Sequence, residues 1–354
     1  MTDELVVVTQ DPRFGGGALA HTRAFVDGAE ALGHRTRTLH PPFVPLVDSV
    51  NQLARAQRIA RLARRAGDLW VVAAAAPYGY GAARSGRAYR AWIGTSLGEE
   101  WEARRAGLTR GRRLALDANA PLLRRLERVV LQGAERVYAT SPASREALAA
   151  ASSLSANDIE ILRIPVDTER FHPEPEADWL ARLDRPTVVF VGRGDDPRKN
   201  VRLLLEAWPA IHAAVPAARL RLVGRPPLQP LPRGADAVGE VASVAEELVG
   251  ASLFVLPSLQ EGFGIVAAEA LAAGVPAVVT PSGGPEELVG RSGGGVVLAD
   301  FHPDTLADAV VTLLTDEARL LEARGRGRRY VEEQHAPASF RKRLAAILSE
   351  DRGA

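Results

Sequence analysis

The chain has no cysteine among its 354 residues, and its seven histidines are scattered. Disulfides and thiolate metal sites are therefore excluded, and no histidine cluster is present for a transition metal. Aromatic residues make up only 5% of the chain, so there is little material for stacking on single-stranded nucleic acid, and no nucleic-acid-binding module is visible. The longest uncharged apolar run, residues 69–76, is too short to span a bilayer. We therefore expect no metal cofactor, no nucleic-acid partner and no transmembrane helix.

Lysine is almost absent as well. Of the 44 basic residues only Lys199 and Lys342 are lysine, and the other 42 are arginine. Lys199 lies in a turn at a predicted helix start, six residues after Arg193. Because the chain uses arginine almost everywhere else, a lysine here suggests that this position needs a compact ammonium and not a planar guanidinium. On this observation alone, chance explains the placement equally well.

The net charge is +1 but is unevenly distributed. Residues 51–136 contain 17 Arg against 7 Asp and Glu, which predicts a basic surface on this part of the chain. Four arginines, Arg55, Arg58, Arg61 and Arg65, recur on one face of a helix predicted over residues 53–65. Such a stripe is most often a solvated face, and the alternative is weak peripheral contact with an anionic membrane or acceptor. Because residues 1–10 lack the features of a signal peptide, we expect a cytoplasmic protein, at most peripheral to the inner face of the membrane.

The length favours two domains, and the order of apolar runs favours two parallel sheets. Strand-like runs alternate with helical stretches, a pattern typical of doubly wound α/β domains with helices on both faces of each sheet. We predict domains at residues 1–167 and 168–336, with a final helix at 337–354 that packs back on the first. The predicted strands are residues 4–9, 35–39, 70–74, 136–139, 159–162, 187–191, 219–223, 253–256 and 277–280, and predicted helices include residues 17–33, 51–66 and 118–133.

The segment from Leu253 to Val289 contains two carboxylates around one helix start. Glu261 lies in a turn after a strand, and Glu269 lies in the helix predicted over residues 265–273. Glycines at 262 and 264 leave the first backbone N–H groups of that helix uncovered, and such a helix start favours an anion. In doubly wound sheets ligands bind at the carboxyl ends of strands, so residues 192–200, 224–227 and 257–264 should line one crevice. Two carboxylates flanking a phosphate site suit a nucleotide sugar.

Two stretches of the C-terminal half of the chain resemble the retaining glycosyltransferases of family four, which have the GT-B fold. One is Glu261 to Glu269 with the following GVPAVVTPSGGPEE, and the other is VVFVGRGDDPRKNVRLLLEAW from Val188 to Trp208. The resemblance covers the chain from about residue 167 to its end, whereas the N-terminal half matches only loosely. It implies two Rossmann-like domains that face a central cleft.

The resemblance also implies roles for individual residues. Arg193 and Lys199 would bind the diphosphate and stabilise it as it leaves, Glu261 would contact the transferred sugar, and Glu269 would accept hydrogen bonds from the ribose. Each role has a competing interpretation. Arg193 and Lys199 could belong to a surface turn with an ion pair to Asp195 or Asp196. Glu261 could be a turn acid without a ligand, and Glu269 could be a solvated helix carboxylate. The other expected donor-binding residues are Gly16, Gly17, Gly192, Arg225, Gly262, Phe263, Gly264 and Ile265.

The N-terminal half contains a second glycine-rich segment, Phe14-Gly15-Gly16-Gly17, which suits a loop that closes over the donor. Gly15, Gly17 and Ala20 also satisfy the dinucleotide pattern G-x-G-x-x-A. Two features count against a dinucleotide: five residues separate the strand from the first glycine, and the second strand ends in Leu-His, where an acid is expected.

Two positions depart from the family pattern. Thr95 or Ser96 stands where similar enzymes carry a histidine that meets the sugar, and Ile164-Pro165-Val166-Asp167 replaces the usual Pro-Asn-Gly-Val-Asp. Thr95 and Ser96 are therefore the candidates for contact with sugar or acceptor, and the identities of both stay open.

The sequence thus predicts a retaining hexosyltransferase that uses a UDP- or GDP-linked sugar, without a cofactor or an essential metal. No residue is a convincing nucleophile, so we expect same-face transfer in which the leaving phosphate helps to deprotonate the acceptor. The acceptor is a small molecule, a glycan or a lipid-linked group, and the protein is a monomer or a homodimer. A sugar-nucleotide epimerase or hydrolase and a non-catalytic nucleotide-sugar-binding protein are the alternatives.

Overall fold

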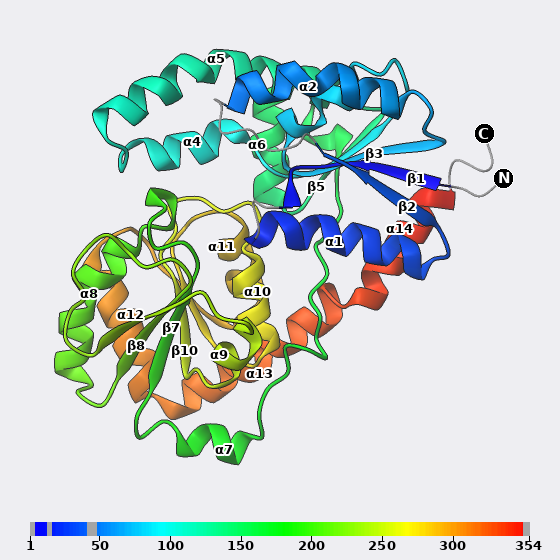
Figure 1. Ribbon diagram of the computed structural model, residues 1–354. Coiled ribbons are helices and arrows are strands. Elements are labelled where there is room, and N and C mark those ends of the chain that lie inside the picture. The colour runs from blue at the N-terminus through cyan, green and yellow to red at the C-terminus, as the bar shows by residue number, and fades with distance from the viewer. Residues whose placement is uncertain (1–3, 13–15, 41–47, 350–354) are drawn as a thin grey trace. The chain divides into compact units, whose positions relative to one another are not determined.

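The computed structural model describes residues 4–12, 16–40 and 48–349, and for residues 48–52, 54 and 55 it describes the backbone alone. The chain divides into two compact units (Figure 1). The first combines the residues up to Pro165 with those from Pro337 onward, and the second runs from Val166 to Ala336. The first unit is thus built from two segments that are far apart in the sequence. None of the described helices has both the length and the apolar character needed to cross a bilayer.

The first unit contains a six-stranded parallel sheet in the order β2-β1-β3-β4-β5-β6. Helices cover both faces of this sheet, with α1 and α14 on one face and α2, α3 and α5 on the other (Figure 1). Its elements are β1 (Glu4–Val8), α1 (Gly16–Ala31), β2 (Arg35–Leu39), α2 (Asp48–Ala63), β3 (Asp68–Ala75), α3 (Tyr80–Ala83), β4 (Arg90–Thr95), α4 (Leu97–Arg105), α5 (Arg110–Gly133), β5 (Arg136–Ala139), α6 (Pro142–Ser152), β6 (Ile159–Ile161) and α14 (Pro337–Ser349).

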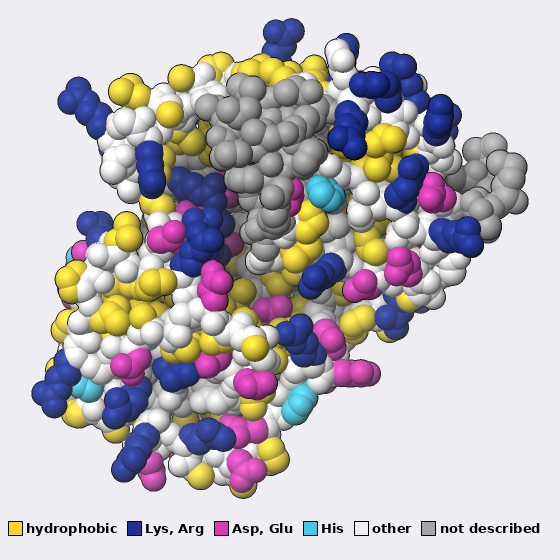
Figure 2. All heavy atoms as spheres, in the orientation of Figure 1, with side chains coloured by type: hydrophobic (Ala, Val, Ile, Leu, Met, Phe, Trp, Pro, Cys, Tyr) yellow, Lys and Arg dark blue, Asp and Glu magenta, His cyan; other side chains and the backbone are white. Residues whose placement is uncertain are grey.

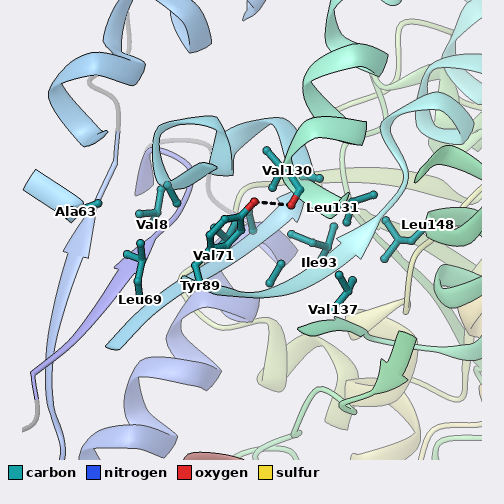
Figure 3. Close-up of a cluster of buried hydrophobic side chains, with 14 of the residues drawn as sticks. Val8, Ala63, Leu69, Val71, Tyr89, Ile93, Val130, Leu131, Val137 and Leu148 are labelled. Atoms are coloured by element: carbon teal, nitrogen blue, oxygen red, sulfur yellow. Dashed lines mark hydrogen bonds between the residues drawn. The ribbon is translucent and has the colours of Figure 1, made fainter. Parts of the chain in front are cut away.

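One face of this sheet is aliphatic. Side chains such as Val71, Ile93 and Val137 pack against Val130 and neighbouring residues of the covering helices (Figure 3). The only polar side chain labelled in that view, Tyr89, donates its hydroxyl to the carbonyl of Val130 at 2.6 Å. The polar end of the ring is therefore satisfied inside the core, as a buried tyrosine requires.

The other face is aromatic and is covered by α1 and α14. Trp92 of β4 stacks on Phe340 of α14 with ring centroids 5.4 Å apart, and Phe25 of α1 lies 4.7 Å from Trp70 of β3. Gly28 of α1 allows the close approach of α14, because a Cβ at this position would lie 2.6 Å from the Phe340 ring. Residues from the end of the chain thus complete the core of the first unit.

The second unit contains a six-stranded parallel sheet in the order β12-β11-β10-β7-β8-β9. Counted within this unit the order is 6-5-4-1-2-3, the arrangement of Rossmann domains. Helices α8 and α12 pack together, and α10 packs against α9, α11 and α13. The elements are α7 (Glu176–Ala181), β7 (Thr187–Val191), α8 (Val201–Ala214), β8 (Arg219–Val223), β9 (Ala235–Gly239), α9 (Val244–Val249), β10 (Leu253–Leu256), α10 (Ile265–Ala272), β11 (Ala277–Val279), α11 (Gly284–Ser292), β12 (Gly295–Val297), α12 (Pro303–Thr315) and α13 (Glu317–Gln334).

Two arginines of α13 hold the C-terminal end of α10. Arg328 donates to the carbonyl of Ala272 at 2.5 Å, and Arg324 donates to the carbonyl of Gly274 at 3.0 Å. The last carbonyls of a helix have no partner within the helix, so these guanidinium groups satisfy them and also complement the negative end of the helix dipole. Helix α10, which carries Glu269, is therefore anchored at its far end.

Candidate functional site

In the second unit, loops from four neighbouring strands are tied together at the carboxyl ends of those strands. The loop after β7 bonds the loop after β8 through Gly194 N–H and the Arg225 carbonyl at 2.8 Å. It also bonds the loop after β10 through Leu259 N–H and the Arg198 carbonyl at 2.8 Å. Glu261 N–H donates to the carbonyl of Ser282 after β11, again at 2.8 Å. The chain reverses its winding direction between β7 and β10, and such a switch point is where doubly wound sheets bind their ligands.

Glycine is required where the loop after β10 enters α10. Gly264 precedes the first residue of this helix and has φ +79°, a left-handed conformation that glycine adopts without strain. A Cβ at Gly264 would lie 2.5 Å from Pro285 of α11, and one at Gly284 would lie 2.4 Å from the Cα of Phe263. Close packing of α11 against this loop therefore fixes the positions of Gly262, Phe263 and Gly264 at the start of α10.

Glu261 is the centre of an ion cluster that we define as Arg198, Lys199, Ser258 and Glu261. The carboxylate accepts hydrogen bonds from Lys199 Nζ at 2.5 Å, from Ser258 Oγ at 2.7 Å and from Arg198 Nη1 at 3.2 Å. The side chain of Glu261 is 9% exposed, whereas those of Arg198 and Lys199 are 15% and 16% exposed. The cluster thus joins residues that lie 62 and 63 positions apart in the sequence.

The charges of this cluster keep Glu261 ionised. Burial alone would raise the pKa of Glu261, but the Lys199 and Arg198 charges, together with hydrogen bonds from Lys199 and Ser258, lower it to about 2. Two cations against one carboxylate leave the four residues with an excess positive charge, which suits an anionic ligand. A carboxylate with so low a pKa is a weak base, which favours a binding role over proton transfer.

Arg198 was not among the residues singled out from the sequence. It donates to the backbone carbonyl of Gln260 at 2.9 Å as well as to Glu261, so it holds both the charge and the backbone of the loop after β10. The sequence offered one indication that Arg198 belongs to the site, which is its position next to Lys199. The abundance of arginine in this chain hides that signal, since an arginine beside any given residue is common here.

Arg193 and Arg225 lie apart from this ion cluster and meet at Asp195. Arg193 Nε is 3.3 Å from Asp195, and Arg225 Nη1 is 4.0 Å from the same carboxylate. Both arginine side chains are more than half exposed, so their ion pairs are weak and easily exchanged for a ligand. Gly192 precedes this pair, at the end of β7, and its N–H donates to the Val223 carbonyl.

Glu269 lies on α10, one turn after Ile265, and its side-chain carboxylate has no hydrogen bond or ion pair with any residue in the described part of the chain. Burial raises the pKa of Glu269 to about 7, and the Arg170 charge opposes this rise. A half-buried carboxylate without a partner is costly unless a ligand supplies hydrogen-bond donors. Glu269 therefore has the properties expected of a ligand-binding group.

In the first unit the predicted glycines lie at the start of α1. Gly16 has φ +57° and open space around its Cα, and Gly17 is exposed, while Phe14 and Gly15 of the same predicted loop lie outside the described residues. Hydrogen bonds from Gln10 Nε2 to the Ala18 carbonyl and to Thr22 Oγ1, at 2.8 and 3.0 Å, fix the first turns of α1. The winding of this sheet reverses between β1 and β3, so α1 begins at a second switch point.

Thr95 and Ser96 end β4 and begin α4, and both are buried. The hydroxyl oxygen of Ser96 accepts the N–H of Gly98 at 3.2 Å and so caps α4. Within the described residues, no group of three or more His, Asp and Glu side chains is arranged to hold a metal ion.

Residues 185–316 match the family model of the glycosyl transferases group 1. A GDP-mannose-dependent alpha-(1-6)-phosphatidylinositol monomannoside mannosyltransferase from Mycobacterium tuberculosis is 34% identical over 255 residues, which are 65% of this chain and 66% of the relative. The protein of the same name from Mycolicibacterium smegmatis is 34% identical over 258 residues, which are 66% of this chain and 67% of that relative.

Solved structures share the fold at low sequence identity. Anabaena HepE in complex with UDP and glucose superimposes with a TM-score of 0.72 at 16% identity, over 99% of this chain and 100% of that one. Sucrose-phosphate synthase from Thermosynechococcus elongatus gives a TM-score of 0.79 at 18% identity, over 99% of each chain.

Proposed function

Because this chain belongs to the glycosyl transferases group 1, we propose that it transfers a hexose-type sugar from a nucleoside diphosphate sugar to an acceptor. The observation that carries the proposal is the ion cluster around Glu261. It places Lys199 and Arg198 at the switch point of a Rossmann sheet, beside the positive N-terminal end of α10. These groups suit a diphosphate that gains charge as it leaves the sugar.

In this mechanism Lys199 and Arg198 bind the leaving diphosphate, and the exposed Arg193 exchanges Asp195 for a phosphate oxygen. Glu261 contacts the hydroxyls of the transferred sugar, and Glu269 accepts hydrogen bonds from the ribose. The low pKa of Glu261 makes it a poor nucleophile and a poor base. Retention is what the family resemblance implies, and retention without a protein nucleophile is what same-face transfer provides. The leaving phosphate then takes the acceptor proton, and the reaction needs no essential metal. A covalent sugar adduct trapped on Glu261 would overturn this mechanism.

GDP-mannose is the first donor to test, because the mycobacterial relatives are GDP-mannose-dependent by name. Calorimetric titration of UDP, GDP, ADP, dTDP and their sugar conjugates into the protein should show micromolar binding of one base. Glu269→Ala should abolish that binding. If none of the nucleotides binds, the proposal is wrong. If the donor is consumed fully without any acceptor, the enzyme is a hydrolase or an epimerase.

The same titrations should depend on pH. Glu269 must be ionised to accept hydrogen bonds from ribose, and burial raises its pKa to about 7, so protonation below that pH competes with binding. We expect nucleotide affinity about tenfold lower at pH 6 than at pH 8, with proton release on binding at pH 6. Glu269→Gln should remove this pH dependence, whereas Glu206→Gln on α8 should keep it. An equal pH dependence in all three proteins would show that another group titrates.

The mycobacterial relatives act by name on a phosphatidylinositol glycolipid, so we propose a lipid-linked acceptor and weak membrane contact through α2 and α5. Exposed Arg58 and Arg61 lie on α2 together with exposed Leu53 and Leu62, and Leu114 of α5 is 65% exposed. Figure 2 shows basic and apolar side chains interleaved over this upper part of the first unit. An amphipathic basic surface of this kind suits an anionic bilayer.

Vesicle sedimentation tests the membrane contact. The wild type should bind vesicles containing anionic phospholipid and should be released by salt. Each basic residue near such a surface contributes about 1 kcal/mol, so Arg58→Glu with Arg61→Glu should weaken binding about 30-fold. The matched control, Arg202→Glu with Arg219→Glu in the second unit, should bind like the wild type. Two results would contradict the membrane contact: vesicle binding that does not depend on anionic lipid, or wild-type binding by both double variants.

A further inference from the structure

The junction between β4 and α4, which we call the loop after β4, is held by partly buried hydrogen bonds on both sides of Ser96. The carbonyl of Gly94 accepts the hydroxyls of Thr140 and Ser144, at 3.0 and 2.8 Å. Beyond it, the N–H of Leu97 donates to the carboxylate of Glu127 on α5 at 2.9 Å. This loop cannot shift without breaking several of these partly buried hydrogen bonds.

Glu127 is the least expected of these groups. It is 1% exposed, and its carboxylate accepts the N–H of Leu97 at 2.9 Å. Leu97 is the first residue of α4 and directly follows Ser96. The Ser96 oxygen in turn receives the N–H of Gly98 at 3.2 Å. Glu127 therefore holds the first turn of α4 at the residue next to Ser96.

The ionisation of Glu127 is sensitive near neutral pH. Burial raises the pKa of Glu127 to about 7, although Leu97, Ser96 and the Arg124 charge lower it, and the Glu100 charge raises it further. Arg124 lies on the same helix as Glu127, and Glu100 lies on α4. A protonated Glu127 is a weaker acceptor for the Leu97 N–H than the carboxylate is, because charge-assisted hydrogen bonds are the stronger ones.

We propose that Glu127 is a positioning residue, which fixes Ser96 and the start of α4 and thereby holds the loop after β4 in the form that sugar transfer needs. The inference rests on the proposed function, in which Thr95 and Ser96 belong to the part of the site that meets the sugar or the acceptor. Glu127 acts through Ser96 and Leu97 and makes no contact with a substrate itself.

Amide hydrogen exchange tests the positioning without any substrate. In Glu127→Gln the amides of Leu97 and Gly98 should exchange about tenfold faster than in the wild type at pH 8, since the charged acceptor is lost. The melting temperature at pH 8 should not fall, because burial opposes ionisation of Glu127 and glutamine avoids that cost. Glu135→Gln, an exposed acid just after the same helix, is the matched control. Equal exchange in the wild type and both variants would overturn the proposal.

Kinetics test whether the positioning serves transfer. With GDP-mannose and phosphatidylinositol vesicles as probes, Glu127→Gln should lower kcat about tenfold and leave the donor KM unchanged. At saturating donor, the kcat of the wild type should decrease as the pH is lowered below about 7, where Glu127 becomes protonated. The kcat of Glu127→Gln should not change over the same pH range. An unchanged kcat with the same pH profile would overturn the role in transfer. If the wild type does not turn over, the proposed function fails, and the exchange data still decide the positioning.

Discussion

Lys199→Ala should lower kcat/KM roughly 10²- to 10³-fold, equivalent to about 3 to 4 kcal/mol of lost transition-state stabilisation. Lys199 would contribute twice: its ammonium stabilises charge on the leaving diphosphate, and its 2.5 Å contact with Glu261 orients the carboxylate that meets the sugar. The measurement is steady-state donor turnover, with nucleotide affinity measured separately by calorimetry.

The chain offers a natural control for this experiment. Lys342, its only other lysine, is exposed on α14, and Lys342→Ala should leave turnover unchanged. Lys199→Arg should recover part of the loss at most, because a guanidinium must share the position with Arg198 and cannot place a compact charge at the same point. Wild-type turnover in Lys199→Ala would mean that the ion cluster only supports the loop after β10.

Phe340→Ala should destabilise the first unit by about 3 to 5 kcal/mol, the usual cost of removing a buried phenyl ring. Phe340 is 5% exposed, stacks on Trp92 and fills the space that Gly28 leaves on α1. Its loss would open a cavity between the aromatic face of the sheet and the helix that completes the unit. Denaturant unfolding followed by hydrogen exchange should show earlier opening of the first sheet.

The matched control is Phe301→Ala in the second unit, where the side chain is 41% exposed. This variant should change stability little, because a large part of the ring already contacts solvent. If Phe340→Ala were as mild as Phe301→Ala, α14 would contribute little to the stability of the first unit. Nucleotide affinity should be unchanged in Phe301→Ala, since Phe301 is not among the candidate donor-binding residues.

The central strands were the easiest elements to predict. The runs at residues 187–191 and 253–256 are observed as β7 and β10, because strands buried on both faces are nearly continuous apolar runs. The run at 219–223 is observed as β8, whose alternating Arg and Leu residues are typical of a strand with one more exposed face. The prediction of two Rossmann-like α/β domains is confirmed by the two sheets and by the solved structures with the same fold.

Other elements were missed for identifiable reasons. Strand β9 is a largely exposed edge strand of small residues with one acid, and β12 is three residues long and follows a run of glycines, so neither has a clear apolar pattern. Helix α5 begins at Arg110, eight residues before the predicted start at residue 118. Its first half is largely exposed and rich in arginine, and so lacks the apolar periodicity on which the prediction relied.

The amino-acid sequence by itself determined the class of fold, the family and the presence of Glu261, Lys199 and Glu269 near strand ends, because these depend on local patterns. Only the tertiary structure decided which of these groups meet. The pairing of β7 with β10 brings Lys199 and Arg198 onto Glu261, while α10 leaves Glu269 without a partner among the described residues. Contacts across 60 residues or more follow from strand order and packing, and packing within each unit also buries Glu127 and half-buries Glu269, which raises the pKa of each to about 7.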